Sequence, residues 1–241
     1  MQADRAKEAR LIYQAVIFDL FGTLVDSANS AHLIKLFREP VASLDCDADE
    51  FMTAWLGIYQ DRATGRLGSV ANEIKYLCDR MGVQATPDQL QTVLDLRLDA
   101  FRRQCEPRTS VPDTLRKLKQ MGLKVGLISD CGSEIPDIWP DLALSTLIDE
   151  AVFSCSEGTT KPDPTLYRIA CERLEVEPSR CIYVGDGGSR ELSGASAAGM
   201  EPVLIRVDYE HFFDANRADI RNWTGKVISD ISEVLDIVAY Q

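Results

Sequence analysis

Long apolar runs are missing from this sequence. Its apolar stretches are short and are flanked by Gly, Pro or Asp, whereas a membrane-spanning helix needs about 20 consecutive apolar residues. The first residues, MQADRAKEARLIYQ, mix charges and contain no apolar segment of the kind found in a secretory signal. We therefore expect neither a membrane span nor a secretory signal.

Basic residues are in the minority, because 26 Lys and Arg stand against 38 Asp and Glu, for a formal net charge of −12. Such a charge repels the phosphate backbone of nucleic acids and the surface of anionic membranes. We expect no nucleic-acid partner and no membrane partner. A small anionic substrate is compatible with this charge, since a local cation or metal ion can dominate one pocket.

Paired cysteines and clustered histidines are also absent. The seven cysteines are an odd number and form no C-x-x-C pair, a pattern typical of neither a disulfide framework nor a zinc site. Reduced thiols are the simplest interpretation, which favours a cytoplasmic location. The two histidines, His32 and His211, have no recognisable partner in the sequence.

What the sequence does contain is a series of short apolar runs rich in β-branched residues, each followed by a turn signal or a polar residue. They occupy residues 14–19, 123–129, 151–154, 180–186 and 202–207. Segments with helical spacing lie between several of them, which predicts βαβ units and an α/β fold with a doubly wound parallel sheet. The final KVISD and ISEVLDIVAY predict an edge strand and a closing helix.

Residues 27–107 interrupt this alternation with consecutive amphipathic helical patterns and no clear strand. We expect one core made of residues 1–26 and 108–241, with residues 27–107 inserted as a helical unit. The two crossings between them, near residues 26–29 and 106–111, are expected to act as hinges.

Polar residues that follow the expected strands are the candidates for a site, because ligands of doubly wound sheets bind at the carboxyl ends of the strands. These residues are Asp19, Ser129, Asp130, Lys161, Asp186 and, one helical turn on, Glu191. Carboxylates, one lysine and one hydroxyl that converge on one edge can hold a divalent cation and an anionic group.

Four motifs in order carry a resemblance to the haloacid dehalogenase superfamily of hydrolases. They are DLFGT at residues 19–23, the strand that ends at Ser129, Lys161 followed by Pro162, and GDGGSRE at residues 185–191. The resemblance implies a Rossmann-like core and a catalytic carboxylate. The helical insertion matches the cap of such proteins only in position, length and class.

Carried over to this sequence, the resemblance implies that Asp19 is the nucleophile. A Mg²⁺ ion would be held by the Asp19 carboxylate, the backbone carbonyl of Phe21 and Asp186, with Glu191 contributing directly or through water. Many relatives carry Asp at the position of Glu191.

The resemblance also implies which groups would hold the transferring group. These are Ser129, the backbone N–H of Asp130 and Lys161, and Thr23 of the first motif is placed among the substrate-binding residues. Lys161 would in addition compensate the carboxylates.

Phe21 departs from the pattern, because phosphatases of this family usually carry Asp two residues after the nucleophile. That Asp protonates the leaving group and then activates water, and such general acid–base help is worth ~10² to 10⁴ in rate. Three alternatives remain open. The first is phosphoryl transfer, either from a substrate with a good leaving group or with a cap residue as the proton donor. The second is a 2-haloacid dehalogenase-like displacement at carbon, which uses no metal. The third is a non-catalytic protein that binds Mg²⁺ and phosphate.

Cap residues do not decide between these alternatives. Arg38 and Arg66 are candidate contacts for an anionic substrate, although arginines on helical faces are more often solvated or ion-paired. Lys35 is the residue that would form a Schiff base if the chain worked like the phosphonate-cleaving members, whose surrounding residues it does not resemble.

Overall fold

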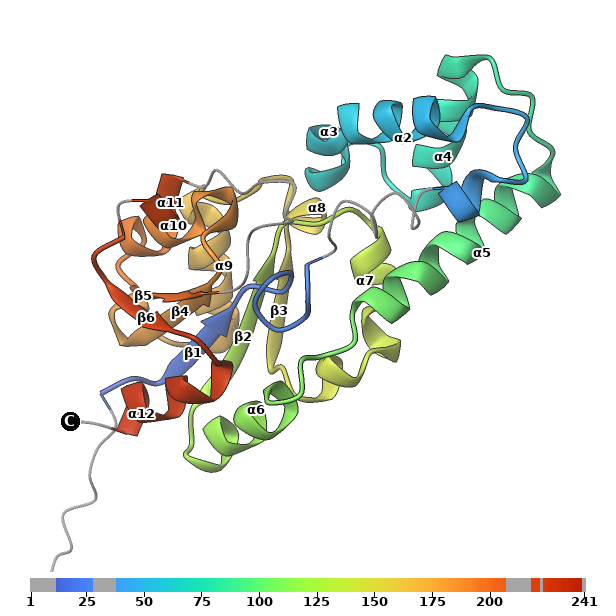
Figure 1. Cartoon of the computed structure of the whole chain (residues 1–241). Helices are drawn as coiled ribbons and strands as arrows, with labels where there is room; N and C mark the ends of the chain where they lie inside the picture. Colours follow the sequence, from blue (N-terminus) through green and yellow to red (C-terminus); the bar gives the residue numbers. More distant parts are fainter. Residues whose placement is uncertain (1–11, 28–37, 207–217, 222, 240–241) are drawn as a thin grey trace, which may run out of the picture.

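The computed structural model describes residues 12–27, 38–206, 218–221 and 223–239. Within these ranges the chain forms a six-stranded sheet with the order β3-β2-β1-β4-β5-β6 (Figure 1). All neighbouring strands are parallel. The strands are β1 (Ala15–Phe18), β2 (Lys124–Ser129), β3 (Glu150–Phe153), β4 (Cys181–Gly185), β5 (Glu201–Ile205) and β6 (Lys226–Ile228). The prediction of an α/β fold with a doubly wound parallel sheet is confirmed, and so is the edge strand near the C-terminus.

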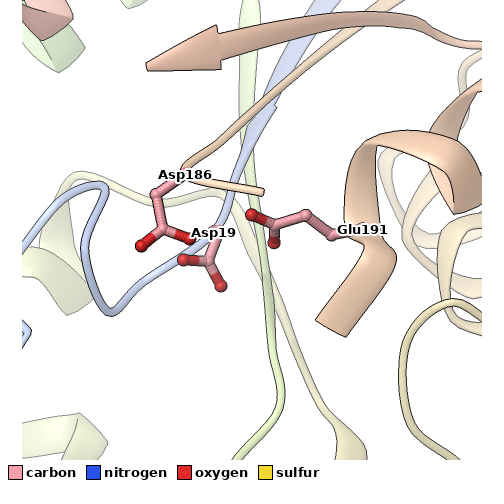
Figure 2. A group of neighbouring side chains, drawn as sticks. All are labelled: Asp19, Asp186 and Glu191. Atoms are coloured by element: carbon pink, nitrogen blue, oxygen red, sulfur yellow. The ribbon is translucent and has the colours of Figure 1, made fainter. Parts of the chain in front are cut away.

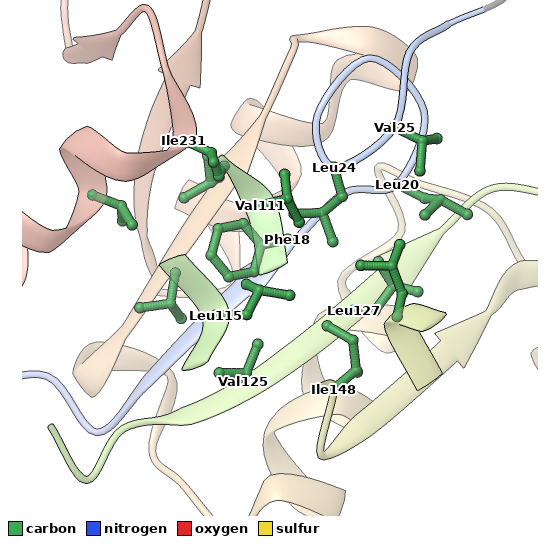
Figure 3. Close-up of a cluster of buried hydrophobic side chains, with 14 of the residues drawn as sticks. Phe18, Leu20, Leu24, Val25, Val111, Leu115, Val125, Leu127, Ile148 and Ile231 are labelled. Carbon is green, nitrogen blue, oxygen red and sulfur yellow. The ribbon is translucent and has the colours of Figure 1, made fainter. Parts of the chain in front are cut away.

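Helices cover both faces of the sheet, because side chains of each strand point alternately to opposite sides. Phe18 and Val125 face α6 (Val111–Gln120) and α12 (Val234–Ala239) in one buried apolar cluster, part of which Figure 3 shows. Ile17 and Ile128 face α9 (Pro164–Leu174) and α10 (Glu191–Ala197) in a second cluster. The short helix α11 (Ala218–Arg221) contacts α10.

Four described helices lie between β1 and α6, at one end of the molecule in Figure 1. They are α2 (Ala48–Gly57), α3 (Tyr59–Ala63), α4 (Val70–Met81) and α5 (Pro87–Gln104). Side chains cap three of their N-termini, from Asp47, Ser69 and Thr86. These helices bury an apolar cluster of their own around Phe51 and Trp55. The described part of residues 27–107 contains no strand, as the sequence pattern predicts.

The chain leaves the sheet region and returns to it at one place. Val25 forms an isolated antiparallel bridge with Pro107, and the backbone N–H of Arg108 donates to the carbonyl of Leu24 at 3.0 Å. The Arg108 guanidinium also pairs with Asp26, with Nε 2.8 Å from Oδ1. Two segments that are far apart in sequence are thus tied together where the helices α2–α5 begin and end.

Short helical turns fill the remaining connections. They are α7 (Glu134–Ile138), α8 (Ser154–Glu157) and the 3-10 turns η1 (Trp139–Asp141), η2 (Ala143–Thr146), η3 (Pro178–Arg180), η4 (Gly188–Arg190) and η5 (Ile231–Glu233). Helix α7 follows β2 directly and contacts α5, whereas α8 follows β3 and contacts α3. The loops after β2 and β3 therefore lie against the helices α2–α5. None of the described helices combines the length and apolarity needed to cross a membrane.

Candidate active site

The site is built where strand order reverses. β1 has β2 on one side and β4 on the other, and ligands of doubly wound sheets bind at such a switch point, beyond the carboxyl ends of the strands. Asp19 directly follows β1, and Asp186 directly follows β4. Because these two strands pair in register, with Phe18 opposite Val184, the two carboxylates are brought to the same edge.

Asp19, Asp186 and Glu191 form an acidic group at this edge. One carboxylate oxygen of each residue lies within 4.8 Å of those of the other two, and all three residues are buried. Figure 2 shows their carboxylates turned toward one another, with Glu191 extending from the start of α10. Carboxylate oxygens are the type of ligand that a hard divalent cation such as Mg²⁺ prefers.

Gly22 explains why the first motif contains glycine. Its φ is +86°, a left-handed conformation that glycine adopts readily, and a Cβ there would overlap Asp186 Oδ2. Gly185 is similarly constrained, since a Cβ at that position would overlap Glu191 Oε1. The glycines beside Asp19 and Asp186 therefore permit the close approach of the acidic side chains.

Lys161 joins two members of this acidic group. Its Nζ lies 2.6 Å from Asp19 Oδ1 and 2.6 Å from Glu191 Oε2, and the lysine side chain is buried. Burial by itself lowers the pKa of Lys161, but the Asp19 and Glu191 carboxylates outweigh it and raise the pKa well above its ordinary value. Lys161 is therefore a permanent cation in the site.

One ammonium does not neutralise three carboxylates. Burial raises the pKa of Asp19; Lys161 opposes this effect and Asp186 adds to it. Burial and the neighbouring Asp19 carboxylate raise the pKa of Glu191 to about 8. These shifts mean that the site resists holding all of its negative charge without a further cation. The oxygen donors and this charge imbalance fit a divalent metal ion.

Glu191 is fixed by hydrogen bonds in addition to the lysine. Its Oε1 accepts from the backbone N–H of Gly187 at 2.9 Å, and its Oε2 accepts from the Tyr183 hydroxyl at 2.9 Å. Tyr183 belongs to β4, where the sequence pattern indicates only a buried strand residue. No local signal marks its hydroxyl as part of the site, because the partner becomes apparent only once α10 packs on the sheet.

The hydroxyl of Ser129 is a buried polar group without a hydrogen-bond partner among the described residues. Its Oγ is shielded from solvent. An unpaired buried hydroxyl is costly, so this one is suited to a ligand oxygen. Next to it, Asp130 Oδ1 accepts from the backbone N–H of Lys161 at 2.9 Å, which ties the loop after β2 to the loop after β3.

Thr23 lies beside Asp19. Its Oγ1 donates to Asp19 Oδ2 at 3.2 Å, and the residue is fully buried. With Lys161 on Oδ1 and Thr23 on Oδ2, both oxygens of Asp19 accept a hydrogen bond. Phe21 is partly buried and packs against the apolar cluster on the α6 face of the sheet.

Arginines suggested by the sequence as substrate contacts are found in exposed ion pairs instead. Arg38 binds Asp49, with Nη2 2.6 Å from Oδ1, and Arg66 Nη1 lies 3.1 Å from Asp61 Oδ1. The candidates Lys35, His32 and His211 lie outside the described residues.

Tyr59, which the sequence does not single out, belongs to this region. The residue is exposed as a whole, but desolvation of its hydroxyl and the nearby Asp130 raise its pKa, and Lys161 opposes that shift. Tyr59, the first residue of α3, therefore lies close enough to Asp130 and Lys161, in the loops after β2 and β3, for their charges to shift its pKa.

Comparison with known proteins shows the family of this chain. The family model for haloacid dehalogenase-like hydrolases matches residues 13–199. The chain belongs to this family of hydrolases, so the resemblance noted in the sequence is confirmed. It is 26% identical over 234 residues to a glyceraldehyde 3-phosphate phosphatase of Methanopyrus kandleri, covering 93% of this chain and 97% of that protein.

Solved structures show the same fold. A 2-haloacid dehalogenase from Pseudomonas syringae superposes with a TM-score of 0.66 at 18% identity, over 94% of this chain and 98% of the other. An enzyme of the family from Bacteroides thetaiotaomicron, solved with magnesium and inorganic phosphate, gives a TM-score of 0.62 at 16% identity, over 83% of this chain and 99% of the other. At these identities the likeness concerns the fold alone.

Proposed function

We propose that this protein is a Mg²⁺-dependent phosphatase that hydrolyses a small phosphorylated metabolite through an aspartyl-phosphate intermediate on Asp19. The observation that carries the proposal is the buried group of Asp19, Asp186 and Glu191, in which Lys161 bridges Asp19 and Glu191. Relatives over nearly the whole chain support the phosphoryl chemistry, since they include the glyceraldehyde 3-phosphate phosphatase and an N-acetylmuramic acid 6-phosphate phosphatase of Pseudomonas aeruginosa.

Asp19, Asp186 and the backbone carbonyl of Phe21 are the proposed Mg²⁺ ligands. Glu191 is engaged by Lys161, Tyr183 and Gly187, so we assign it to orienting Lys161 and to a contact with the metal through water. When bound, the ion would neutralise the carboxylates and the phosphoryl oxygens together.

Asp19 would attack phosphorus in line with the leaving group. Lys161, the Ser129 hydroxyl and the backbone N–H of Asp130 would hold the phosphoryl oxygens, whose charge is stabilised by donors already in place. Thr23 and Lys161, which each donate to one oxygen of Asp19, would fix the orientation of the attacking carboxylate.

Phe21 shapes the proposed substrate preference. A benzyl side chain can neither protonate a leaving alcohol nor activate water, so charge must build up on the departing oxygen. Substrates with stable leaving groups, such as acyl or aryl phosphates, should therefore react best. Residues 27–107 would form the cap over a core made of residues 1–26 and 108–241, with the tied crossing at Asp26 and Arg108 as its base.

The decisive experiment measures phosphate release from an acyl, an aryl and an alkyl phosphate, with Mg²⁺ and with excess chelator, alongside halide release from a 2-haloacid. The proposal expects metal-dependent phosphate release and no halide. Halide release that persists in chelator would favour displacement at carbon. Absence of both reactions, together with binding of Mg²⁺ and phosphate, would favour a non-catalytic protein.

A further inference from the structure

A cluster of buried charged side chains lies beside the site, where helices α3, α4, α5 and α7 meet. Its members are Arg62, Glu73, Arg97 and Glu134. Arg62 binds two acids at once: Nε lies 2.9 Å from Glu73 Oε2, and Nη2 lies 2.5 Å from Glu134 Oε1. Arg97 binds the same oxygen of Glu134, with Nη2 at 2.5 Å.

Trp55 completes the cluster. The Cζ atoms of Arg62 and Arg97 lie 4.4 Å and 3.8 Å from the centre of its ring. The positive charges of two buried guanidinium groups are thus balanced by two buried carboxylates, beside an aromatic ring. Burying four charges costs free energy that a pair of apolar residues would not, so a role beyond simple packing is worth testing.

Glu134 connects this cluster to the proposed phosphoryl-binding loop. It is the first residue of α7 and comes four residues after Asp130. Between them, Gly132 has no space for a side chain: a Cβ would overlap Glu134 Oε2 and would lie 2.6 Å from Arg62 Nη2. The Arg62 guanidinium therefore lies against Gly132, in the loop formed by residues 130–133.

The same loop is also tied to the segments that follow β3. The backbone N–H of Cys131 donates to Ser154 Oγ at 3.0 Å, and Asp130 Oδ1 accepts from the backbone N–H of Lys161. Ser133 Oγ donates to Glu73 Oε1 at 3.1 Å, which adds a second link to the helices α2–α5. The loop is therefore held both by the segments that follow β3 and by the charged cluster.

We propose that Arg62 is a positioning residue for the loop of residues 130–133, and that through this loop it places Ser129 and the backbone N–H of Asp130 against the substrate phosphoryl group. The kinetic part of this inference rests on the proposed phosphatase activity. The structural part, that Arg62 restrains the loop, does not.

Arg97 supplies a matched control. It comes from α5, binds the same Glu134 oxygen and stacks on the same Trp55 ring. It is Arg62, however, whose guanidinium meets the position of a Gly132 Cβ. Arg62→Met and Arg97→Met each remove one guanidinium from the cluster, so a general loss of stability should appear in both, whereas a loss of loop position should appear in the first.

Hydrogen exchange of the amides of Cys131, Gly132 and Ser133 tests the restraint without any substrate. We expect faster exchange in Arg62→Met than in Arg97→Met at matched distance from the unfolding midpoint. Equal exchange in the two variants would overturn the proposal and leave the cluster as a means of holding helices together. If Arg62→Met does not fold, Arg62→Lys serves instead, since it keeps the charge but has a single nitrogen for two acids.

Steady-state kinetics on an aryl phosphate test the consequence. We expect kcat/KM to fall by about 10- to 100-fold in Arg62→Met, as for a small displacement of a positioned group, and by much less in Arg97→Met. In a double-mutant cycle, Arg62→Met and Ser129→Ala should be strongly non-additive, because both act on one contact. Additive effects would refute action through the loop. If Arg62→Met alters amide hydrogen exchange in the loop but the parent hydrolyses no phosphate ester, the proposed function is refuted, whereas the restraint of the loop by Arg62 is supported.

Discussion

Lys161 and Glu191 form a buried ion pair, with Nζ 2.6 Å from Oε2, and the same nitrogen lies 2.6 Å from Asp19 Oδ1. The length of the glutamate side chain allows this arrangement: Oε1 still accepts from Gly187 N–H while Oε2 meets the lysine. The pair therefore orients the cation toward Asp19. It also gives Glu191 a structural role at a position where the family resemblance leads one to expect Asp.

Asp186→Asn should abolish tight Mg²⁺ binding. The substitution keeps the shape of the side chain but removes a charged oxygen ligand from a site that holds three buried carboxylates. Calorimetric titration of the metal-free protein measures the change. Asp113→Asn, on the exposed face of α6, is the control and should bind as the parent does. Unchanged binding by Asp186→Asn would remove this residue from the proposed ligands.

Asp19→Asn should keep the fold and lose turnover. The amide fills the same space between Lys161 and Thr23 but cannot attack phosphorus. Phosphate release should fall to background, and mass spectrometry of rapidly quenched parent enzyme should detect phosphate on a peptide that contains Asp19. A variant that retains more than a few per cent of the parent rate would contradict the nucleophile assignment.

Phe21→Asp should raise the hydrolysis of alkyl phosphates by ~10-fold or more, since a restored acid supplies part of the usual acid–base contribution. The parent should prefer aryl over alkyl phosphates strongly, and the variant less so. Phe21→Asn is the matched control, because Asn has nearly the same size as Asp and carries no titratable group.

Folding of both Phe21 variants must be checked first. The ring packs on an apolar cluster, and its loss costs stability by ~1 to 3 kcal/mol if the cavity partly closes. Two results together would mean that another residue donates the proton: folded Phe21→Asp hydrolyses alkyl phosphates no faster than Phe21→Asn, and the parent shows no leaving-group preference.

Glu134→Gln should destabilise the protein at neutral pH and much less in acid. Burial raises the pKa of Glu134, but Arg62 and Arg97 outweigh it and lower the pKa to about 2. A carboxyl group whose pKa is lower in the folded state contributes stability above its unfolded pKa of about 4.5, and this contribution is lost as pH falls toward 2. Removal of one member of a buried ion pair costs about 3 to 5 kcal/mol.

Denaturant unfolding of the parent and Glu134→Gln at several pH values between 3 and 7 measures this difference in the free energy of unfolding. The difference should be largest near pH 7 and should shrink steadily below about pH 5. A difference that is the same at pH 3 and pH 7 would mean that the ionised form of Glu134 is not what stabilises the fold.

Local sequence patterns were sufficient to predict the strands. The run that contains Ala15–Phe18 is apolar, β-branched and ends at Asp19, and the run at Cys181–Gly185 ends at Asp186 in the same way. Because both signals are contained within a few neighbouring residues, alternation with helices and the parallel sheet followed from them. The edge strand at Lys226–Ile228 was predicted on the same basis.

Long-range partners were not predictable in this way. Tyr183 has the pattern of a core residue, and only the packing of α10 against β4 brings its hydroxyl to Glu191. Arg62 and Glu134 are 72 positions apart and on different helices, and neither has a local motif. Ion pairing of Arg38 and Arg66 was considered from the sequence, but their partners, Asp49 and Asp61, were not identified.

The sequence by itself therefore determined which residues end the strands, and it indicated that oxygen ligands with one lysine would gather at one edge. Tertiary structure decided how the charges are shared: Lys161 between Asp19 and Glu191, and Glu134 between Arg62 and Arg97. The physical reason is that backbone conformation and strand ends depend on neighbouring residues. The partner of a buried charge depends on which segments pack together, and that is settled only when the whole core forms.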